Sequence, residues 1–163
     1  MIYKELHQER IADQNMEQKN NYKNHFKYLL TSFVKVLQKT YSKESSELIL
    51  KDTFTFLKKN AKKEPLYLFK DALNKSKPFC EVKSIRISGT NYKVPVEIDS
   101  DRQRILVFKW IVFNSIKRSD FCLSINLGKE ILDTCDLNSK TIKMCDDFHK
   151  VAESNKVYIQ SRN

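Results

Sequence analysis

Glycine and proline are scarce in this sequence, with only 2 Gly and 3 Pro among 163 residues. So few turn residues argue against sandwiches, barrels and glycine-rich nucleotide-binding loops, and they favour helices. No internal repeat is visible, which excludes solenoids. The longest apolar run, residues 105–116, is interrupted by Lys109 and Asn114. Because a bilayer span needs about 20 apolar residues, we expect no membrane partner.

Metal-binding and catalytic patterns are also missing. The four cysteines include no C-x-x-C pair, and none has a nearby histidine in a nucleophile pattern. We therefore expect reduced, mostly buried thiols, no cofactor, no metal site and no catalytic residue. His149 and Glu153 stand four residues apart, which indicates an ion pair on a helix surface. A metal-dependent nuclease using His149 is a distant alternative.

The residues that are present predict one core and a basic surface. The chain is 40% hydrophobic and carries a formal net charge of +10. Residues 20–63 hold ten cations and three acids, and residues 75–118 hold ten cations and four acids. Such concentrated charge suits a polyanion-binding surface, although it also keeps a protein soluble. Charge alone leaves both interpretations open.

Hydrophobic periodicity predicts a mainly α fold. Helical spacing runs over residues 22–37, over a second helix with Ser42 as N-cap, and over a third that begins at Pro65. The second helix is expected to end in a basic loop, residues 58–63. A capping box at residues 100–103 opens a fourth, strongly apolar and therefore central helix that ends near residue 116, with Trp110 in the core. Fifth and sixth helices are expected at residues 123–135 and 142–158.

Between the third and fourth helices the period changes to two. Residues 80–87 and 92–98 alternate in polarity and flank the turn residues 88–91, so we predict a β-hairpin arm at about residues 79–98. Pro95 must face outward because it cannot donate to a ladder. A lone ribbon is marginal and has to rest on a helix or a partner. The expected organisation is a variable extension, residues 1–20, and one helical domain, residues 21–163.

The order of these elements and several ordered motifs resemble the small-subunit ribosomal protein seven family. The resemblance covers about residues 33–162 and is strongest from Glu81 onward. Its motifs are Glu81-Val82-Lys83-Ser84, Gly89 to Glu97, Trp110-Ile111-Val112, Lys117-Arg118, Leu127 with Glu130, Ile131 and Asp133, and Asp147 to Lys156.

This resemblance implies a six-helix bundle with a β-arm that acts in the ribosome and is no enzyme. It implies binding to the 3′ major domain of small-subunit rRNA, nucleation of head assembly, and neighbouring proteins of the head and platform. It also places the arm near the exit-site tRNA and the mRNA path. The family's basic N-terminal tail is replaced by a slightly acidic segment, residues 1–19, with no recognisable transit peptide. With abundant Lys, Asn, Ile, Phe and Tyr, this suggests an organellar protein, first a mitochondrial one, with a plastid or a cleaved presequence as alternatives.

The predicted rRNA contacts are cations on the arm and at its base. Lys83, Arg86 and Lys93 lie on the predicted arm, and Arg102, Arg104, Lys117 and Arg118 bracket the fourth helix. Arg102 and Arg104 oppose the helix dipole, so they call for an anion partner. The resemblance adds Lys43 and Lys143, and it assigns the tip residues Ser88, Gly89, Thr90, Asn91 and Tyr92 to the tRNA and mRNA side. For Tyr92, packing against the ribbon is favoured slightly over base stacking. The competing hypothesis is a helical protein–protein adaptor with a basic surface and no specific RNA site.

Overall fold

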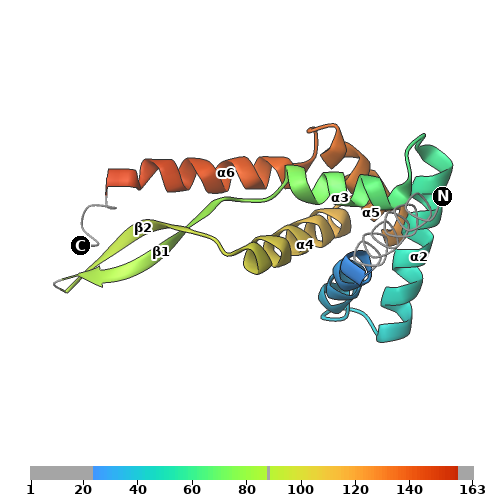
Figure 1. Ribbon diagram of the computed structural model, residues 1–163, viewed down its shortest axis with the longest axis horizontal. Coiled ribbons are helices and arrows are strands. Elements are labelled where there is room, and N and C mark those ends of the chain that lie inside the picture. Colours follow the sequence, from blue (N-terminus) through green and yellow to red (C-terminus); the bar gives the residue numbers. More distant parts are fainter. Residues whose placement is uncertain (1–23, 88, 158–163) are drawn as a thin grey trace, which may run out of the picture.

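The computed structural model describes residues 24–87 and 89–157. Within these ranges it contains six helices and one two-stranded antiparallel sheet, and the sheet stands between the third and fourth helices. The helices are residues 24–37, α2 (Lys43–Asn60), α3 (Pro65–Lys75), α4 (Ser100–Ile116), α5 (Leu123–Cys135) and α6 (Lys140–Ser154). The predicted six-helix fold with an inserted hairpin is therefore confirmed (Figure 1). Tyr22, Ser88, Tyr158 and the proposed extension 1–20 lie outside the described residues.

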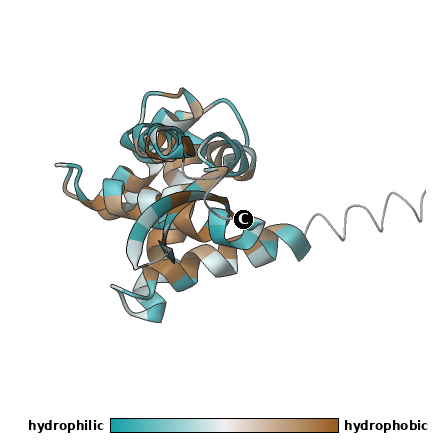
Figure 2. Ribbon diagram, turned by 90° about the vertical axis from the view of Figure 1, so that its left-hand side faces the viewer, coloured by the Kyte–Doolittle hydropathy of each residue, from teal (hydrophilic) through white to brown (hydrophobic). Residues whose placement is uncertain are grey.

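Three phenylalanines form the centre of the core. Phe33 meets the rings of Phe69 and Phe108 edge-on at centroid distances of 5.3 and 5.1 Å, and all three are fully buried. Leu57 of α2 and Ile131 of α5 complete the same cluster. Seen from the arm end, hydrophobic residues gather between the helices and hydrophilic ones cover their outer turns (Figure 2). Burial of this apolar surface is the main source of stability.

The close packing of α2 against α5 requires a glycine. A Cβ atom at Gly128 would lie 3.0 Å from Cε1 of Phe56 and closer still to its Cδ1. The second glycine, Gly89, has a φ of +88°, which L side chains rarely adopt. The two glycines thus serve a helix contact and the tip of the arm.

Several predicted boundaries need correction. Asp99, not Ser100, caps α4: its side chain accepts from the Asp101 N–H, and Gln103 donates to the Ile98 carbonyl instead of closing a capping box. Helix α2 continues to Asn60, into the predicted basic loop, and the second strand begins at Thr90 within the predicted turn. The N-cap at Ser42 and the start of α3 at Pro65 are confirmed.

Helix α4 is less enclosed than its composition suggested. It contacts α3, α5 and α6, and Trp110 is buried with its ring edge-on to Phe148 at 4.9 Å. Ile105, Phe113 and Ile116, however, are all more than 40% exposed. Trp110 is in the core as predicted, and α4 packs on three other helices, but one side of this helix leaves apolar residues exposed.

The hairpin rests on α6. Strands β1 (Cys80–Ile87) and β2 (Thr90–Glu97) pair antiparallel, and α6 runs beside them on the same side of the bundle (Figure 1). At the base, the Phe79 N–H donates to Nε2 of His149 at 3.0 Å, and the two rings stack at 5.7 Å. His149 therefore joins the arm to α6, in place of the predicted ion pair with Glu153. This packing satisfies the need of an isolated ribbon for support.

Candidate nucleic-acid interface

The β register sorts the three predicted arm cations onto two faces. Residues directly opposite share a face, and Ser84 pairs with Lys93, Arg86 with Asn91, and Lys83 with Val94. Arg86 and Lys93 therefore lie on one face of the ribbon, and Lys83 lies on the other. The sequence alone did not show that these three cations lie on different faces.

The acid neighbours of the arm cations differ as well. Lys83 Nζ lies 3.5 Å from a carboxylate oxygen of Glu81. Arg86 and Lys93 are exposed and form no ion pair within the described part of the chain. Two uncompensated cations on one exposed ribbon face are suited to contact phosphates, which position a nucleic acid without reading its bases.

The residues of the arm tip fall into two groups. Gly89, Thr90 and Asn91 are exposed at the tip, while Ser88 is outside the described residues. Tyr92 is half-buried and stands opposite Ile85 on the ladder. This position favours a role for Tyr92 in packing against the ribbon over a role in base stacking.

Arg102 has an anion partner inside the chain. Its guanidinium donates to both carboxylate oxygens of Glu81 at 2.8 to 2.9 Å. The Glu81 side chain is only 8% exposed, and hydrogen bonding to Arg102 lowers the pKa of this carboxyl. The anion partner expected for Arg102 is thus the Glu81 carboxylate at the base of the arm.

Arg104 also has an intramolecular partner. It pairs with Asp101 on the first turn of α4, and its guanidinium lies 5.0 Å from the centre of the Tyr28 ring. Only 16% of its side chain is exposed. Arg104 therefore faces the helical segment 24–37 and lies apart from the arm cations.

At the other end of α4, Arg118 belongs to a buried polar network. It donates to Glu130 at 2.5 and 2.8 Å and to Asp133 at 2.5 Å. Glu130 is fully buried and also accepts from the backbone and hydroxyl of Thr141, at 3.2 and 2.7 Å. This network ties α4, α5 and α6 together, so the geometry gives Arg118 a structural role.

The remaining predicted contacts are exposed lysines far apart along the chain. Lys43 begins α2, Lys117 caps α4 with its amine 3.9 Å from the Phe113 ring centre, and Lys143 lies on the first turn of α6. None of the three forms an ion pair with another described residue. The structure does not join them to the arm cations as one cluster.

Two close approaches between like charges, of Lys77 to Arg104 and of Lys77 to Lys70, were not predicted from the sequence. Burial lowers the pKa of Lys77, and the nearby charges of Arg104 and Lys70 lower it further. Sequence spacing gave no sign of this, because the cations come from α3, the segment after it and α4.

No group of three or more His, Cys, Asp or Glu in residues 24–87 and 89–157 is arranged to hold a metal ion. The prediction of mostly buried thiols is wrong: Cys145 is buried, Cys80 and Cys135 are half-buried, and Cys122 is exposed. Within the described ranges, no helix has the length and apolar character needed to cross a membrane.

Comparison with known proteins matches this chain to one family over most of its length. The family model "Ribosomal protein S7p/S5e" matches residues 6–156. The small ribosomal subunit protein uS7 of Desulfatibacillum aliphaticivorans is 37% identical over 134 residues, covering 82% of this chain and 86% of that protein. The small ribosomal subunit protein uS7m of Reclinomonas americana is 35% identical over 134 residues, covering 82% of this chain and 84% of that protein. The chain therefore belongs to the ribosomal protein S7p/S5e family, a family of structural ribosomal components and not of enzymes.

Proposed function

We propose that this protein binds the 3′ major domain of rRNA in an organellar small ribosomal subunit and nucleates assembly of its head. Family membership gives the general role, and the arm carries the specific argument. Arg86 and Lys93 are exposed on one ribbon face with no carboxylate partner among residues 24–87 and 89–157, on an arm that extends beyond the helical core (Figure 1). Phosphate neutralisation by such cations releases counterions and drives association.

The base of the arm supports this proposal by fixing the position of the cations. Arg102 holds Glu81, and His149 holds the backbone of Phe79. An arm anchored on both α4 and α6 presents Arg86 and Lys93 at a defined distance from the bundle. Less conformational freedom is then lost when RNA binds.

We propose that the arm tip lies on the side of the exit-site tRNA and the mRNA, as the family resemblance implies. We extend this to the exposed residues Gly89, Thr90 and Asn91, whose backbone and side-chain polar groups are open to a nucleic acid. Neighbouring proteins of the head and platform are the other expected partners. The α6 helix, which lies beside the arm, offers the adjacent surface for them.

The mitochondrion is the proposed location. The mitochondrial-type relative uS7m of Reclinomonas americana and the Lys-, Asn- and Ile-rich composition support it, with a plastid as the alternative. Fractionation of organelles from source cells, followed by sucrose-gradient sedimentation, should find the protein with mitochondrial small subunits. Recovery in plastid or cytosolic subunits would contradict this location.

The experiment for the arm compares the wild-type chain with the triple variant Lys83→Ala, Arg86→Ala, Lys93→Ala. Binding to a transcript of the 3′ major domain is titrated with salt. The wild type should show a steep negative log–log slope, and the variant a slope shallower by about two to three units. A wild-type slope near zero would favour the protein–protein adaptor instead.

A further inference from the structure

The segment between the end of α2 and the start of α3, called here the basic turn, carries four exposed lysines: Lys58, Lys59, Lys62 and Lys63. None of the four forms an ion pair with another residue in the described part of the chain. The basic turn lies at the end of the molecule opposite the tip of the arm (Figure 1). It is therefore a second concentration of exposed positive charge, separate from the arm cations.

Hydrogen bonds and packing fix the backbone of the basic turn. The Asn60 side chain donates to the Phe56 carbonyl at 2.8 Å, and the Ala61 N–H donates to the Leu57 carbonyl at 2.9 Å. Ala61 also packs against the hydrophobic core, and Pro65 begins α3 with a restricted φ. Because the lysines extend from a fixed backbone, less conformational freedom is lost when a partner binds them.

The two helix dipoles act differently on the lysines. Lys58 and Lys59 lie in the last turn of α2, where the negative end of the dipole favours cations. Lys62 and Lys63 precede the positive end of the α3 dipole, which disfavours cations, and the first turn of α3 contains no acid. Glu64, at the N-cap position of α3, makes no side-chain capping hydrogen bond and lines a groove together with Lys58. The stability of the two helices therefore does not account for Lys62 and Lys63.

The start of α4 shows how this fold resolves the same conflict elsewhere. Arg102 stands in the first turn of α4, and its partner is the Glu81 carboxylate of the same chain. Lys62 and Lys63 have no carboxylate partner among residues 24–87 and 89–157. An anion that neutralises these two lysines would come from another molecule.

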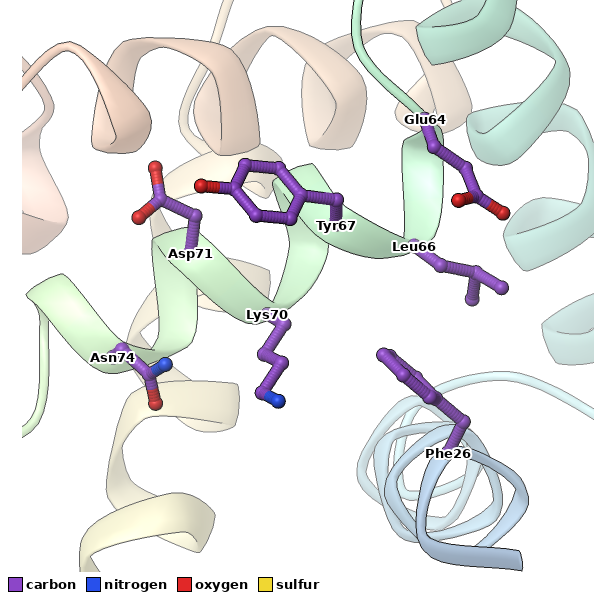
Figure 3. A pocket seen from close by; sticks show the side chains of 7 residues that line it. All are labelled: Phe26, Glu64, Leu66, Tyr67, Lys70, Asp71 and Asn74. Atoms are coloured by element: carbon purple, nitrogen blue, oxygen red, sulfur yellow. The ribbon is translucent and has the colours of Figure 1, made fainter. Parts of the chain in front are cut away.

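Tyr67 adds an aromatic ring to the basic turn. It is 54% exposed, and the Lys63 amine lies 5.6 Å from the centre of its ring. Figure 3 shows the pocket beside the turn, in which the Glu64 carboxylate points away from the Tyr67 ring. The Tyr67 hydroxyl points toward Asp71, and Asp71 already pairs with Lys75 at 2.9 Å. The ring and the Lys63 amine thus form one exposed surface, in which an aromatic face and a positive charge lie side by side.

We propose that the basic turn is a second RNA-binding surface, where Lys59, Lys62 and Lys63 contact phosphates and Tyr67 stacks on an unpaired base. This inference rests on the proposed function and extends it from the arm to the opposite end of the bundle. Backbone-tracking cations combined with an exposed aromatic ring suit single-stranded nucleic acid, because every base has a face that can stack. An acidic protein would use the cations but would not need the ring. Since the turn and the arm tip lie at opposite ends, they contact separate segments of the RNA.

The first test removes charge from the turn and from a matched position. The variant Lys62→Gln, Lys63→Gln should bind the 3′ major domain transcript with a salt slope shallower by about one to two units. The control Lys129→Gln, Lys150→Gln removes the same charge from α5 and α6, where each lysine already pairs with an aspartate, and should keep the wild-type slope. Both variants should melt within about 2 °C of the wild type, because exposed charges contribute little to stability. Equal slopes for the two variants would overturn the proposal.

The second test concerns the aromatic ring. Tyr67→Leu should weaken binding of the transcript about tenfold at constant salt without changing the salt slope, since it removes a stacking surface and no charge. Tyr67→Phe keeps the ring and should bind like the wild type. Unchanged affinity of the leucine variant would overturn the stacking contact with a base.

Lysine footprinting locates the contact and tests the nature of the partner. Each lysine of the full chain is acetylated and read by mass spectrometry for the chain alone, with the transcript, and with poly-glutamate of equal total charge. Lys62 and Lys63 should be protected by the transcript and not by poly-glutamate, while Lys129 and Lys150 stay unprotected. Equal protection by both polyanions would mark a general anion-binding surface and overturn the RNA assignment.

The outcomes separate the basic turn from the general function. A wild type that prefers the 3′ major domain to an unrelated RNA, with Lys62 and Lys63 unprotected and the turn variant unchanged, overturns the basic turn alone. Absence of that preference in the wild type overturns the proposed function, and with it this inference. Protection of the two lysines together with the shallower slope supports both.

Discussion

Arg102 at the start of α4 donates hydrogen bonds from two nitrogen atoms to the carboxylate of Glu81 at the start of the arm. Nε lies 2.9 Å from each carboxylate oxygen and Nη2 lies 2.8 Å from one of them. Glu81 is buried while Arg102 stays largely exposed. The pair thus links the arm to the bundle, and it assigns a structural role to a residue that charge alone would assign to RNA.

Replacing Glu81 with Gln should change how stability depends on pH. Hydrogen bonding to Arg102 lowers the pKa of Glu81 in the folded protein below the ordinary 4.5. A carboxyl with a lowered folded pKa stabilises the fold above its unfolded pKa, and this stabilisation is lost as pH falls through the folded value. The thermal midpoint of the wild type should therefore exceed that of the variant at pH 7, and the gap should close below about pH 4.5. Glu97→Gln, on the exposed side of β2, is the control and should show no such closing gap.

Arg118→Ala should be strongly destabilising. Glu130 is fully buried, and without Arg118 its remaining hydrogen-bond partner among the described residues is Thr141. An uncompensated buried charge of this kind costs about 3 kcal/mol. For a chain of this size that is a fall in the thermal midpoint of about 6–12 °C.

Lys117→Ala is the matched control for Arg118, because the two residues are adjacent and carry the same charge. The Lys117 amine lies over the ring of the exposed Phe113, an interaction worth about 0.5–1 kcal/mol. If both variants melted alike, the structural role given to Arg118 would be wrong.

Single substitutions on the two faces of the arm should differ in their effect on RNA binding. Lys83 is already near Glu81, whereas Lys93 has no acid partner among the described residues. Lys93→Gln should make the salt slope shallower by about one unit, and Lys83→Gln by less. Equal slopes for the two variants in the salt titration would contradict a one-faced contact of the arm with RNA.

Alkylation of the four thiols should follow a fixed order. Hydrogen bonds from the side chain and backbone of Ser124 lower the pKa of the exposed Cys122. Burial raises the pKa of Cys135 and of Cys145 to about 11. Since the thiolate is the reactive form, iodoacetamide at about pH 8 should modify Cys122 first and Cys145 last. Peptide mass spectrometry reads the order, and early modification of Cys145 would contradict its burial.

Local patterns were sufficient to predict the elements of this fold. The period of two over the arm and the apolar stripe of the first helix gave the right types, and Pro65 gave the start of α3. The cap of α4 was misplaced by one residue, because Asp99 and Ser100 are both good capping residues and the sequence does not show which adopts the extended backbone.

The sequence alone could not identify the carboxylates with which the cations pair. Arg102 and Glu81 are 21 residues apart, and Arg118 and Glu130 are 12 apart, so only tertiary packing brings them together. Nothing in the spacing of Lys70, Lys77 and Arg104 shows that they share a pocket. Counting charges along the sequence locates a basic region, but it cannot distinguish cations that are neutralised within the fold from those available to a partner.

The most direct measurement is a competition for the wild-type chain at about 0.15 M salt between the 3′ major domain transcript and an unrelated RNA of equal length. The account predicts that the 3′ major domain is preferred by at least about a hundredfold, with a steep salt dependence for both RNAs. Equal affinity for the two RNAs would contradict it, because the cations of the arm and the bundle would then bind phosphates without recognising the shape of the ribosomal RNA.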